Sequence, residues 1–440
     1  MQQRRDVILV AIVESIASTK ELRHWFDFQI QECNARSRIL ASRTISVYHH
    51  CVEKHVTLRK HEDERLLAGH QWVFSNEIAS VDGSPEAGDV VEILNHDRHL
   101  LGIGFYNPHS LISVRFLASE RVEISNAFFE RRIADALALR NRIFPGSESF
   151  RLVNGESDFL PGLVIDKYNE FLTIQTLSFG MNKHIATICD VLESMMHPKA
   201  IVERNDTPLR TLEHLEEKKG VLRGSAEHTI LSEHSAKFNI DLLKGQKTGF
   251  FLDQRENRKR IRQHVRGAEV LDCFCYEGGF AINASLGGAK RVVGVDISDL
   301  CVERAGVNAV INQAENVEFK QGDVFELLKE YSAEKKKFDV VILDPPSFTR
   351  SRKNVKSALK GYKTINGLAL TLLQEGGFLI TASCSHHITE ESFLETVDES
   401  SRKSGRKLRL LEFSTASPDH PVLVSMPETK YLKFAIFSVQ

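Results

Sequence analysis

Two apolar runs near the carboxyl terminus constrain the fold of this chain more than any other feature. The first, Phe338 to Leu343, leads into the motif DPP at Asp344, and the second, Gly377 to Ala382, leads into the motif SCS around Cys384. Short apolar runs of this kind are typical of buried strands in parallel sheets. Because ligands bind beyond the carboxyl ends of such strands, we expect Asp344 and Cys384 to face one site.

Residues 236–440 contain further apolar runs of this kind, and these β-like runs alternate with helical stretches. The candidate strands read EVLDCF, RVVGVDIS, NVEFKQGD, FDVVILD and GFLITASC. Two late runs, LRLLEFSTA and KYLKFAIFSV, would complete one edge of the sheet. This alternation predicts an α/β fold built on a parallel, doubly wound sheet.

The rest of the chain divides into three further segments, and a length of 440 residues predicts two or three domains. Residues 53–120 carry short alternating runs separated by turn signals, which predict a small all-β barrel. Residues 121–235 combine β-like runs with helical stretches, which predict a central α+β domain. Residues 1–52 match neither pattern, and we expect an N-terminal extension that is partly helical or disordered.

Composition limits the classes of function open to the chain. The net charge is −2, so any binding of nucleic acid must depend on local charge. Seven cysteines without repeated spacing indicate free thiols in a reducing compartment. No apolar run approaches the roughly 20 residues that cross a bilayer, and the run from Val7 to Val13 is short for a secretion signal. We therefore predict a cytoplasmic protein.

Three acids at successive strand ends indicate a nucleoside cofactor. Asp272 ends one candidate strand, and a loop with Gly278 then leads into a helix whose free N–H groups can meet a ligand. Asp296 ends the next strand, where an acid commonly binds ribose hydroxyls, and Asp323 ends the one after. The dinucleotide pattern G-x-G-x-x-G is absent, so we predict S-adenosylmethionine. The alternative for each acid is a helix cap or a solvated turn.

Asp344 and Cys384 are the candidate catalytic residues. A thiolate can add to carbon 6 of cytosine, which makes carbon 5 nucleophilic, and a partly buried Asp344 could stabilise charge on ring nitrogen 3. Enzymes that methylate exocyclic amines often carry an aromatic residue directly after such prolines, but Ser347 stands there. The alternative for Cys384 is a small buried apolar residue. Cys273 and Cys275 lack a second pair, so we predict no metal site.

Two basic stretches could contact a polyanion. The loop after Phe348 contains no acid and carries six cations: Arg350, Arg352, Lys353, Lys356, Lys360 and Lys363. We predict RNA contacts for the first four of them, although such runs are usually solvated faces. A second patch is expected at Arg255, Arg258, Lys259, Arg260, Arg262 and Arg266. A base attacked at its ring must be unpaired or turned out of its stack.

Together these motifs resemble a known family. GHQWVFSNEI, SDFLPGLVIDKY, KTGFFLDQRENR, DCFCYEGGFA, LDPPSF, TASCSHH and DHPVLVSMPETKYLK are similar to sequences of the ribosomal large-subunit RNA cytosine-5 methyltransferases. That family joins an N-terminal PUA domain and a central domain to a class I, Rossmann-like methyltransferase domain. The resemblance covers about residue 53 to the carboxyl terminus. It implies large-subunit ribosomal RNA as partner and a possible homodimer.

The resemblance also implies roles for individual residues. Lys247 to Arg255 would surround S-adenosylmethionine, with Phe251 and Asp253 close to it. Cys384 would be the nucleophile and Asp344 its partner on the base. Ser347 stands where many relatives have a second cysteine, which leaves the base that removes the carbon-5 proton unassigned. The rival hypotheses are methylation of a base nitrogen such as guanine N7, a non-catalytic RNA-binding assembly factor, and an NAD-linked oxidoreductase.

Overall fold

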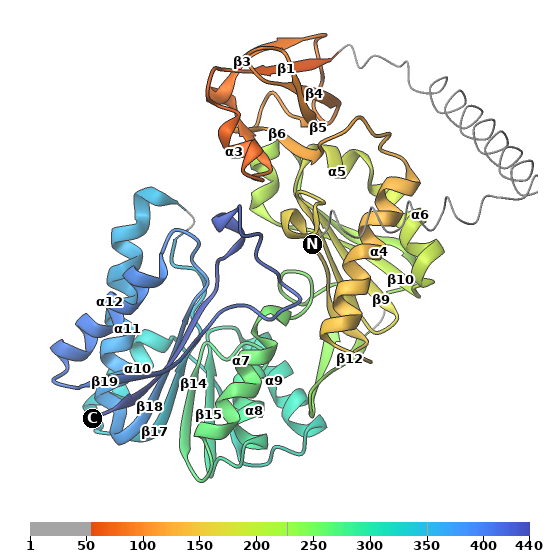
Figure 1. The fold of residues 1–440 in the computed structure, drawn as a ribbon. Coiled ribbons are helices and arrows are strands. Elements are labelled where there is room, and N and C mark those ends of the chain that lie inside the picture. Colours follow the sequence, from red (N-terminus) through yellow and green to blue (C-terminus); the bar gives the residue numbers. More distant parts are fainter. Residues whose placement is uncertain (1–53, 227, 350) are drawn as a thin grey trace, which may run out of the picture. The chain divides into compact units, whose positions relative to one another are not determined.

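The computed structural model describes residues 54–226, 228–349 and 351–440 (Figure 1). The expected N-terminal extension, residues 1–52, lies outside the described residues. Among the described residues, no helix is both long and apolar enough to span a membrane.

The first described segment forms a six-stranded sheet with strand order β2-β6-β5-β4-β1-β3. The alternation of side chains along each strand explains how this sheet forms, because one face of it buries Val56, Val73, Val91 and Val114 in one small core. Its elements are β1 (His55–Leu58), α3 (Glu64–Leu67), β2 (Trp72–Phe74), η1 (Ser75–Glu77), β3 (Ile78–Asp82), β4 (Val90–Leu94), β5 (Leu100–Tyr106) and β6 (Ile112–Ala118).

A five-stranded sheet follows, with strand order β11-β10-β9-β8-β7. One of the expected helical stretches is α4 (Asn126–Ile143), which buries Phe128, Phe129 and Ile133 in the same core as this sheet. The elements are α4 (Asn126–Ile143), β7 (Ser149–Asn154), η2 (Gly155–Asp158), β8 (Leu163–Tyr168), β9 (Phe171–Thr176), α5 (Phe179–Lys183), α6 (Ile185–Met196), β10 (Ala200–Asn205), η3 (Pro208–Glu213) and β11 (Lys218–Gly224).

A two-stranded hairpin, β12 (His228–Glu233) with β13 (Ala236–Asp241), connects this sheet to the last one. Its apolar side chains, among them Leu231 and Phe238, share a core with Tyr168 of β8 and Ile282. The expected domain boundary at residue 235 falls inside this hairpin, between its two strands. The limits of the domains stay predictions.

The carboxyl-terminal sheet has seven strands in the order β16-β15-β14-β17-β18-β20-β19. The five strands from β16 to β18 are parallel, and β20 runs antiparallel to both of its neighbours. The strands are β14 (Glu269–Cys273), β15 (Arg291–Asp296), β16 (Val317–Gln321), β17 (Phe338–Leu343), β18 (Leu373–Ser383), β19 (Leu408–Ser414) and β20 (Lys433–Val439).

Helices cover both faces of this sheet, which makes it doubly wound as predicted (Figure 1). Along β17, Val341 and Leu343 join the core on one face, while Val340 and Ile342 join the core on the other. The helices are η4 (Leu252–Gln254), α7 (Arg255–Arg260), η5 (Ile261–His264), α8 (Gly279–Leu286), α9 (Asp299–Ile311), α10 (Val324–Ala333), η6 (Arg352–Asn354), α11 (Val355–Leu372), α12 (Glu390–Lys403) and η7 (Pro427–Thr429).

Candidate active site

Four of the predicted site residues lie at the carboxyl ends of neighbouring strands. Asp296, Asp272 and Asp344 belong to or follow β15, β14 and β17, and Cys384 follows β18. These strands are adjacent in the sheet, and Leu343 is paired with Thr381 in register. The structure therefore brings the four side chains to one edge of the sheet, as the strand-end argument predicts.

The loop after β14 has a conformation that its sequence makes possible. Gly278 has a φ of +84°, and a Cβ atom at this position would lie 2.8 Å from Cζ of Phe319. Phe274 and Tyr276 also have positive φ angles of 62° and 50°. Such angles in residues other than glycine are uncommon and are concentrated at functional sites. This tight loop leads directly into the first turn of α8.

Asp272 is fully buried beneath this loop. Its Oδ2 accepts a hydrogen bond of 2.9 Å from the backbone N–H of Ala281, whereas Oδ1 is buried without a partner. Burial raises the pKa of Asp272 well above its ordinary value, and the nearby carboxyls of Asp344 and Asp296 raise it further. A buried polar atom without a partner requires an explanation, and a bound ligand is one.

The other two strand-end acids are placed differently. Asp296 holds the loop, because its carboxylate accepts hydrogen bonds from the backbone N–H groups of Tyr276 at 2.9 Å and Ser298 at 3.0 Å. Asp323 is exposed and caps α10, since its Oδ1 accepts hydrogen bonds from the backbone N–H groups of Phe325 at 2.8 Å and Glu326 at 3.2 Å. Asp323 thus has the helix-cap role that was its alternative, and its role toward a cofactor stays a prediction.

Phe251 and Asp253 stand beside the same loop. The ammonium of Lys247 lies 4.4 Å from the centre of the Phe251 ring, and that ring meets Tyr276 edge-on at 5.0 Å. The Tyr431 hydroxyl donates to Asp253 Oδ2 at 2.5 Å, while Oδ1 is buried without a partner. Burial acts to raise the pKa of Asp253, but the charges of Lys247 and His420 bring it below its ordinary value.

Asp344 is half-buried at the start of the Pro-Pro loop. Gln254 donates a hydrogen bond of 3.0 Å from Nε2 to Asp344 Oδ1. Burial, reinforced by the charge of Asp253, raises the pKa of Asp344 to about 7, against an opposing effect of Arg258. At neutral pH a large fraction of this carboxyl is therefore protonated and can donate a proton.

Cys384 is also half-buried, and its Sγ lies 3.9 Å from the carbonyl oxygen of Pro345. Burial raises the pKa of the Cys384 thiol to about 11, although Lys247 and Lys433 act to lower it. The neighbouring Ser385 hydroxyl is hydrogen-bonded to those of Ser347 at 3.0 Å and Tyr362 at 3.1 Å. The loops that carry Asp344 and Cys384 are thus directly linked.

Three of the four residues predicted to contact RNA lie on the surface of the described part of the chain, and their contacts with RNA stay a prediction. Arg352, Lys353 and Lys356 are exposed in η6 and the first turn of α11, whereas Arg350 lies outside the described residues. Arg352 also lines a surface pocket together with Arg65 and His70 of the first segment.

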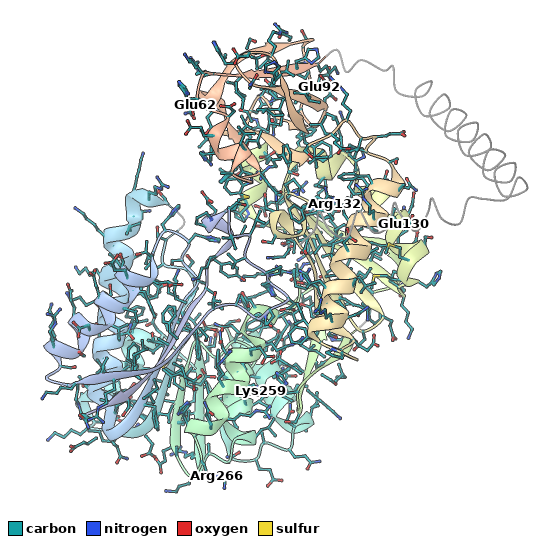
Figure 2. The ribbon with its side chains drawn as sticks, in the orientation of Figure 1. Glu62, Glu92, Glu130, Arg132, Lys259 and Arg266 are labelled. Atoms are coloured by element: carbon teal, nitrogen blue, oxygen red, sulfur yellow. The ribbon has the colours of Figure 1, made fainter. Side chains whose placement is uncertain are left out.

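The prediction of a second patch is wrong for two of its members. Arg255 and Arg258 are both 3% exposed, and Arg258 donates from Nε and Nη2 to the Glu233 carboxylate at 2.7 Å and 2.6 Å. The guanidinium of Arg258 is satisfied in this way, and that of Arg255 is equally buried, so neither lies on the surface where a phosphate could reach it. Lys259 and Arg266 are exposed and are labelled in Figure 2.

Sequence reasoning assigned no individual role to three residues of the site: Gln254, Tyr431 and Lys433. Gln254 and Tyr431 hold the carboxyls of Asp344 and Asp253, and Lys433 lies near the thiol. Two of the three come from the segment that enters β20, far along the chain from the residues they serve. The motifs KTGFFLDQRENR and KYLK contain all three, but no spacing within the sequence connects them.

Comparison with known domains identifies the class of protein. Residues 56–119 match the model of a PUA-like domain, and residues 221–434 match that of an S-adenosylmethionine-dependent methyltransferase. A solved Streptococcus mutans protein assigned as a SAM-dependent methyltransferase shares the fold, with a TM-score of 0.76, 21% identity, and coverage of 87% of this chain and 99% of that one. A methyltransferase structure in complex with SAH gives a TM-score of 0.77 at the same identity and coverage.

Curated relatives then define the family. "Ribosomal RNA large subunit methyltransferase I" of Vibrio vulnificus is 37% identical over 386 residues, which is 86% of this chain and 97% of that relative. The proteins of the same name from Escherichia coli O157:H7 and Pseudoalteromonas atlantica are 38% and 39% identical, over 86% and 87% of this chain and 97% and 99% of theirs. The chain belongs to the ribosomal RNA large subunit methyltransferase I family.

The residues present fit S-adenosylmethionine. The buried oxygens Asp272 Oδ1 and Asp253 Oδ1 have no hydrogen-bond partner among the described residues, and both are acceptors for hydroxyl or ammonium groups. Gly278 gives the loop before α8 a shape that a residue with a Cβ atom could not adopt, because that atom would clash with Phe319. These residues lie on the predicted cofactor side of the site, and Asp344 and Cys384 lie on its predicted side toward the base.

Proposed function

We propose that this chain methylates carbon 5 of an unpaired or flipped cytosine in large-subunit ribosomal RNA, through a transient bond from Cys384 Sγ to carbon 6. The observation that carries the proposal is the adjacency of Asp344 and Cys384 at the ends of β17 and β18, beside the cofactor loop. The names of the relatives support ribosomal RNA as substrate. A homodimer stays a prediction.

Each of the two residues has one chemical task. Cys384 Sγ, once its proton is lost, bonds to carbon 6, and the ring electrons move toward carbon 5 and nitrogen 3. Asp344, half-protonated near neutral pH, donates a proton to nitrogen 3 and so stabilises the developing charge. S-adenosylmethionine, when bound, supplies the electrophilic methyl group. A base then takes the carbon-5 proton, the thiolate leaves carbon 6 and the nitrogen-3 proton returns to Asp344, which restores the cytosine ring and frees Cys384.

One observation favours a rival reaction. Burial raises the pKa of Cys384 to about 11, so little thiolate exists at neutral pH. A methyltransferase that acts on a base nitrogen needs no thiolate, and Asp344 could then hold the base through its exocyclic amine or ring nitrogen. The product of the reaction separates the two proposals.

The test is a product analysis. Purified enzyme is incubated with large-subunit ribosomal RNA and methyl-labelled S-adenosylmethionine, and the RNA is digested to nucleosides for mass spectrometry. We expect label in 5-methylcytidine, and none with Cys384→Ala. Cys189→Ala is the matched control, because Cys189 lies buried in α6 of the central domain. Label on a base nitrogen, or normal turnover by Cys384→Ala, would refute the proposal.

A further inference from the structure

Lys433 lies near Cys384 and has no role in the chemistry described above. It is the first residue of β20 and is paired in register with Ser383, the residue before Cys384. Its side chain reaches inward, since Lys433 is only 3% exposed. Nζ donates hydrogen bonds of 2.7 Å to the carbonyl oxygens of Ser385 and of Tyr431. Two carbonyls thus fix the ammonium directly beside the Cys384 loop.

The charge of this ammonium is not balanced by an acid. Among the described residues, no carboxylate forms an ion pair with Lys433; the nearby Glu390 pairs with Lys430 instead. Carbonyl oxygens satisfy N–H groups but supply no counter-charge, and a buried cation without one is costly. Burial lowers the pKa of Lys433 to about 8, which leaves it mostly charged at neutral pH.

We propose that the buried ammonium of Lys433 is the counter-charge of the Cys384 thiolate, and that Lys433 is a positioning residue that keeps a reactive fraction of this thiol ionised. Only the Sγ–H bond breaks in this step: the proton passes to solvent and the electron pair stays on sulfur. The inference rests on the role of Cys384 as nucleophile in the proposed function.

Among the charged neighbours of the Cys384 thiol, Lys433 is the one that can stabilise the thiolate from the protein interior. Asp344 and Asp253 face the thiol and oppose its ionisation, whereas Lys247 favours it. Lys247 is exposed, so solvent screens its charge, while Lys433 acts from the interior. The charged groups that face Lys433 itself are Cys384 from the loop after β18, Glu390 from α12, Lys430 from its own segment, and His386 when protonated.

The test is the alkylation rate of Cys384 by iodoacetamide in the free full-length protein, because this rate follows the thiolate fraction. It is measured from about pH 6 to about pH 10 by mass spectrometry of the peptide that contains Cys384. For the wild type we expect a rise of about tenfold per pH unit that becomes shallower near pH 8, where Lys433 loses its charge. For Lys433→Met we expect alkylation about tenfold slower at pH 7 and a profile without that bend.

Two further variants separate charge from structure. Lys433→Arg keeps the charge and should restore most of the rate, and Lys430→Met removes an exposed charge of the same segment and should change little. A folded Lys433→Met protein with the wild-type profile would overturn the proposal. A wild-type profile without a bend near pH 8 would overturn it as well, and this measurement needs no variant. Because no RNA is present, failure of the cytosine-5 proposal would appear only in the product analysis.

Discussion

At the residue scale, the same burial acts on the two reacting groups with opposite consequences. It raises the pKa of Asp344 to about 7, which makes this carboxyl a proton donor at neutral pH. It also raises the pKa of Cys384 to about 11, which makes the thiolate scarce. Asp344 is therefore already protonated to a large extent in the free protein, whereas ionisation of Cys384 depends on the cations around its thiol.

These two values, together with the pKa of Lys433, predict the pH dependence of kcat/KM. The thiolate fraction rises about tenfold per pH unit until about pH 8, where Lys433 loses its charge and the rise becomes shallower, while the protonated fraction of Asp344 falls about tenfold per unit above pH 7. Their product rises up to about pH 7 and is level between about pH 7 and about pH 8. In Asp344→Asn no carboxyl titrates, so we expect a lower rate that continues to rise between about pH 7 and about pH 8. Initial rates of methyl transfer measure this.

The matched control is Asp398→Asn, because Asp398 is an exposed carboxylate of α12 whose side chain is 64% accessible. It should keep the wild-type profile. An Asp344→Asn profile that is level between about pH 7 and about pH 8 would show that another group limits the reaction.

At the element scale, the loop between β14 and α8 sets the cofactor side of the site. Asp272 holds the loop from below through Ala281, and Asp296 holds it from the next strand through Tyr276. Gly278 closes the turn with a backbone conformation that L-residues rarely adopt. The function of this element depends on backbone shape more than on any one side chain.

Gly278→Ala tests the dependence on backbone shape. The new Cβ would meet the Phe319 ring at 2.8 Å, and the left-handed conformation costs a non-glycine residue about 1–2 kcal/mol. We expect S-adenosylmethionine binding to weaken at least about tenfold by calorimetry, with a protein that remains folded.

Gly306→Ala is its control, because Gly306 lies within α9 and a Cβ there meets nothing within 4 Å. Replacing a helical glycine should stabilise the fold by about 0.5–1 kcal/mol and leave the affinity for the cofactor unchanged. Equal affinities of the two variants would show that the loop conformation does not matter.

The elements that sequence predicts well are those with strong local signals. The strand at Phe338–Leu343 is an uninterrupted apolar run, and the polar residues that follow it mark its end. The burial of Arg255 and Arg258 has no such signal, because it depends on Glu233 in a hairpin that folds back onto α7. The pKa of Cys384 likewise depends on residues from three separate segments, namely Lys247 and Asp253, Asp344, and Lys433, which no local pattern encodes.

At the scale of the whole molecule, a chain with a net charge of −2 must bind RNA through a local surface. Arg352, Lys353 and Lys356 give such a surface next to the Pro-Pro loop. Arg352 also shares a pocket with Arg65 and His70 of the PUA-like domain, so residues far apart in sequence line one surface. We expect phosphate contacts there.

The double variant Arg352→Gln/Lys353→Gln tests this surface. Each lost phosphate contact should reduce the slope of log affinity against log salt by about 0.7–0.9, and binding should weaken most at low salt. Filter binding of a large-subunit RNA fragment across a salt series measures both effects.

Lys290→Gln/Lys336→Gln is the control for this pair. Both lysines are exposed and lie just before β15 and β17, at the opposite edge of the sheet from the site. Equal slopes for the two double variants would mean that the loop after Phe348 does not touch RNA.

The most direct measurement of the covalent mechanism uses RNA in which cytidine is replaced by 5-azacytidine, incubated with the enzyme and S-adenosylmethionine. The nitrogen at position 5 prevents the final elimination, so a thiolate adduct at carbon 6 accumulates. We predict a covalent complex whose protease digest carries the nucleotide on the peptide containing Cys384, and no complex from Cys384→Ala, which should still bind S-adenosylmethionine. A covalent complex formed by Cys384→Ala, or a wild-type enzyme that methylates RNA but is never trapped, would contradict the mechanism.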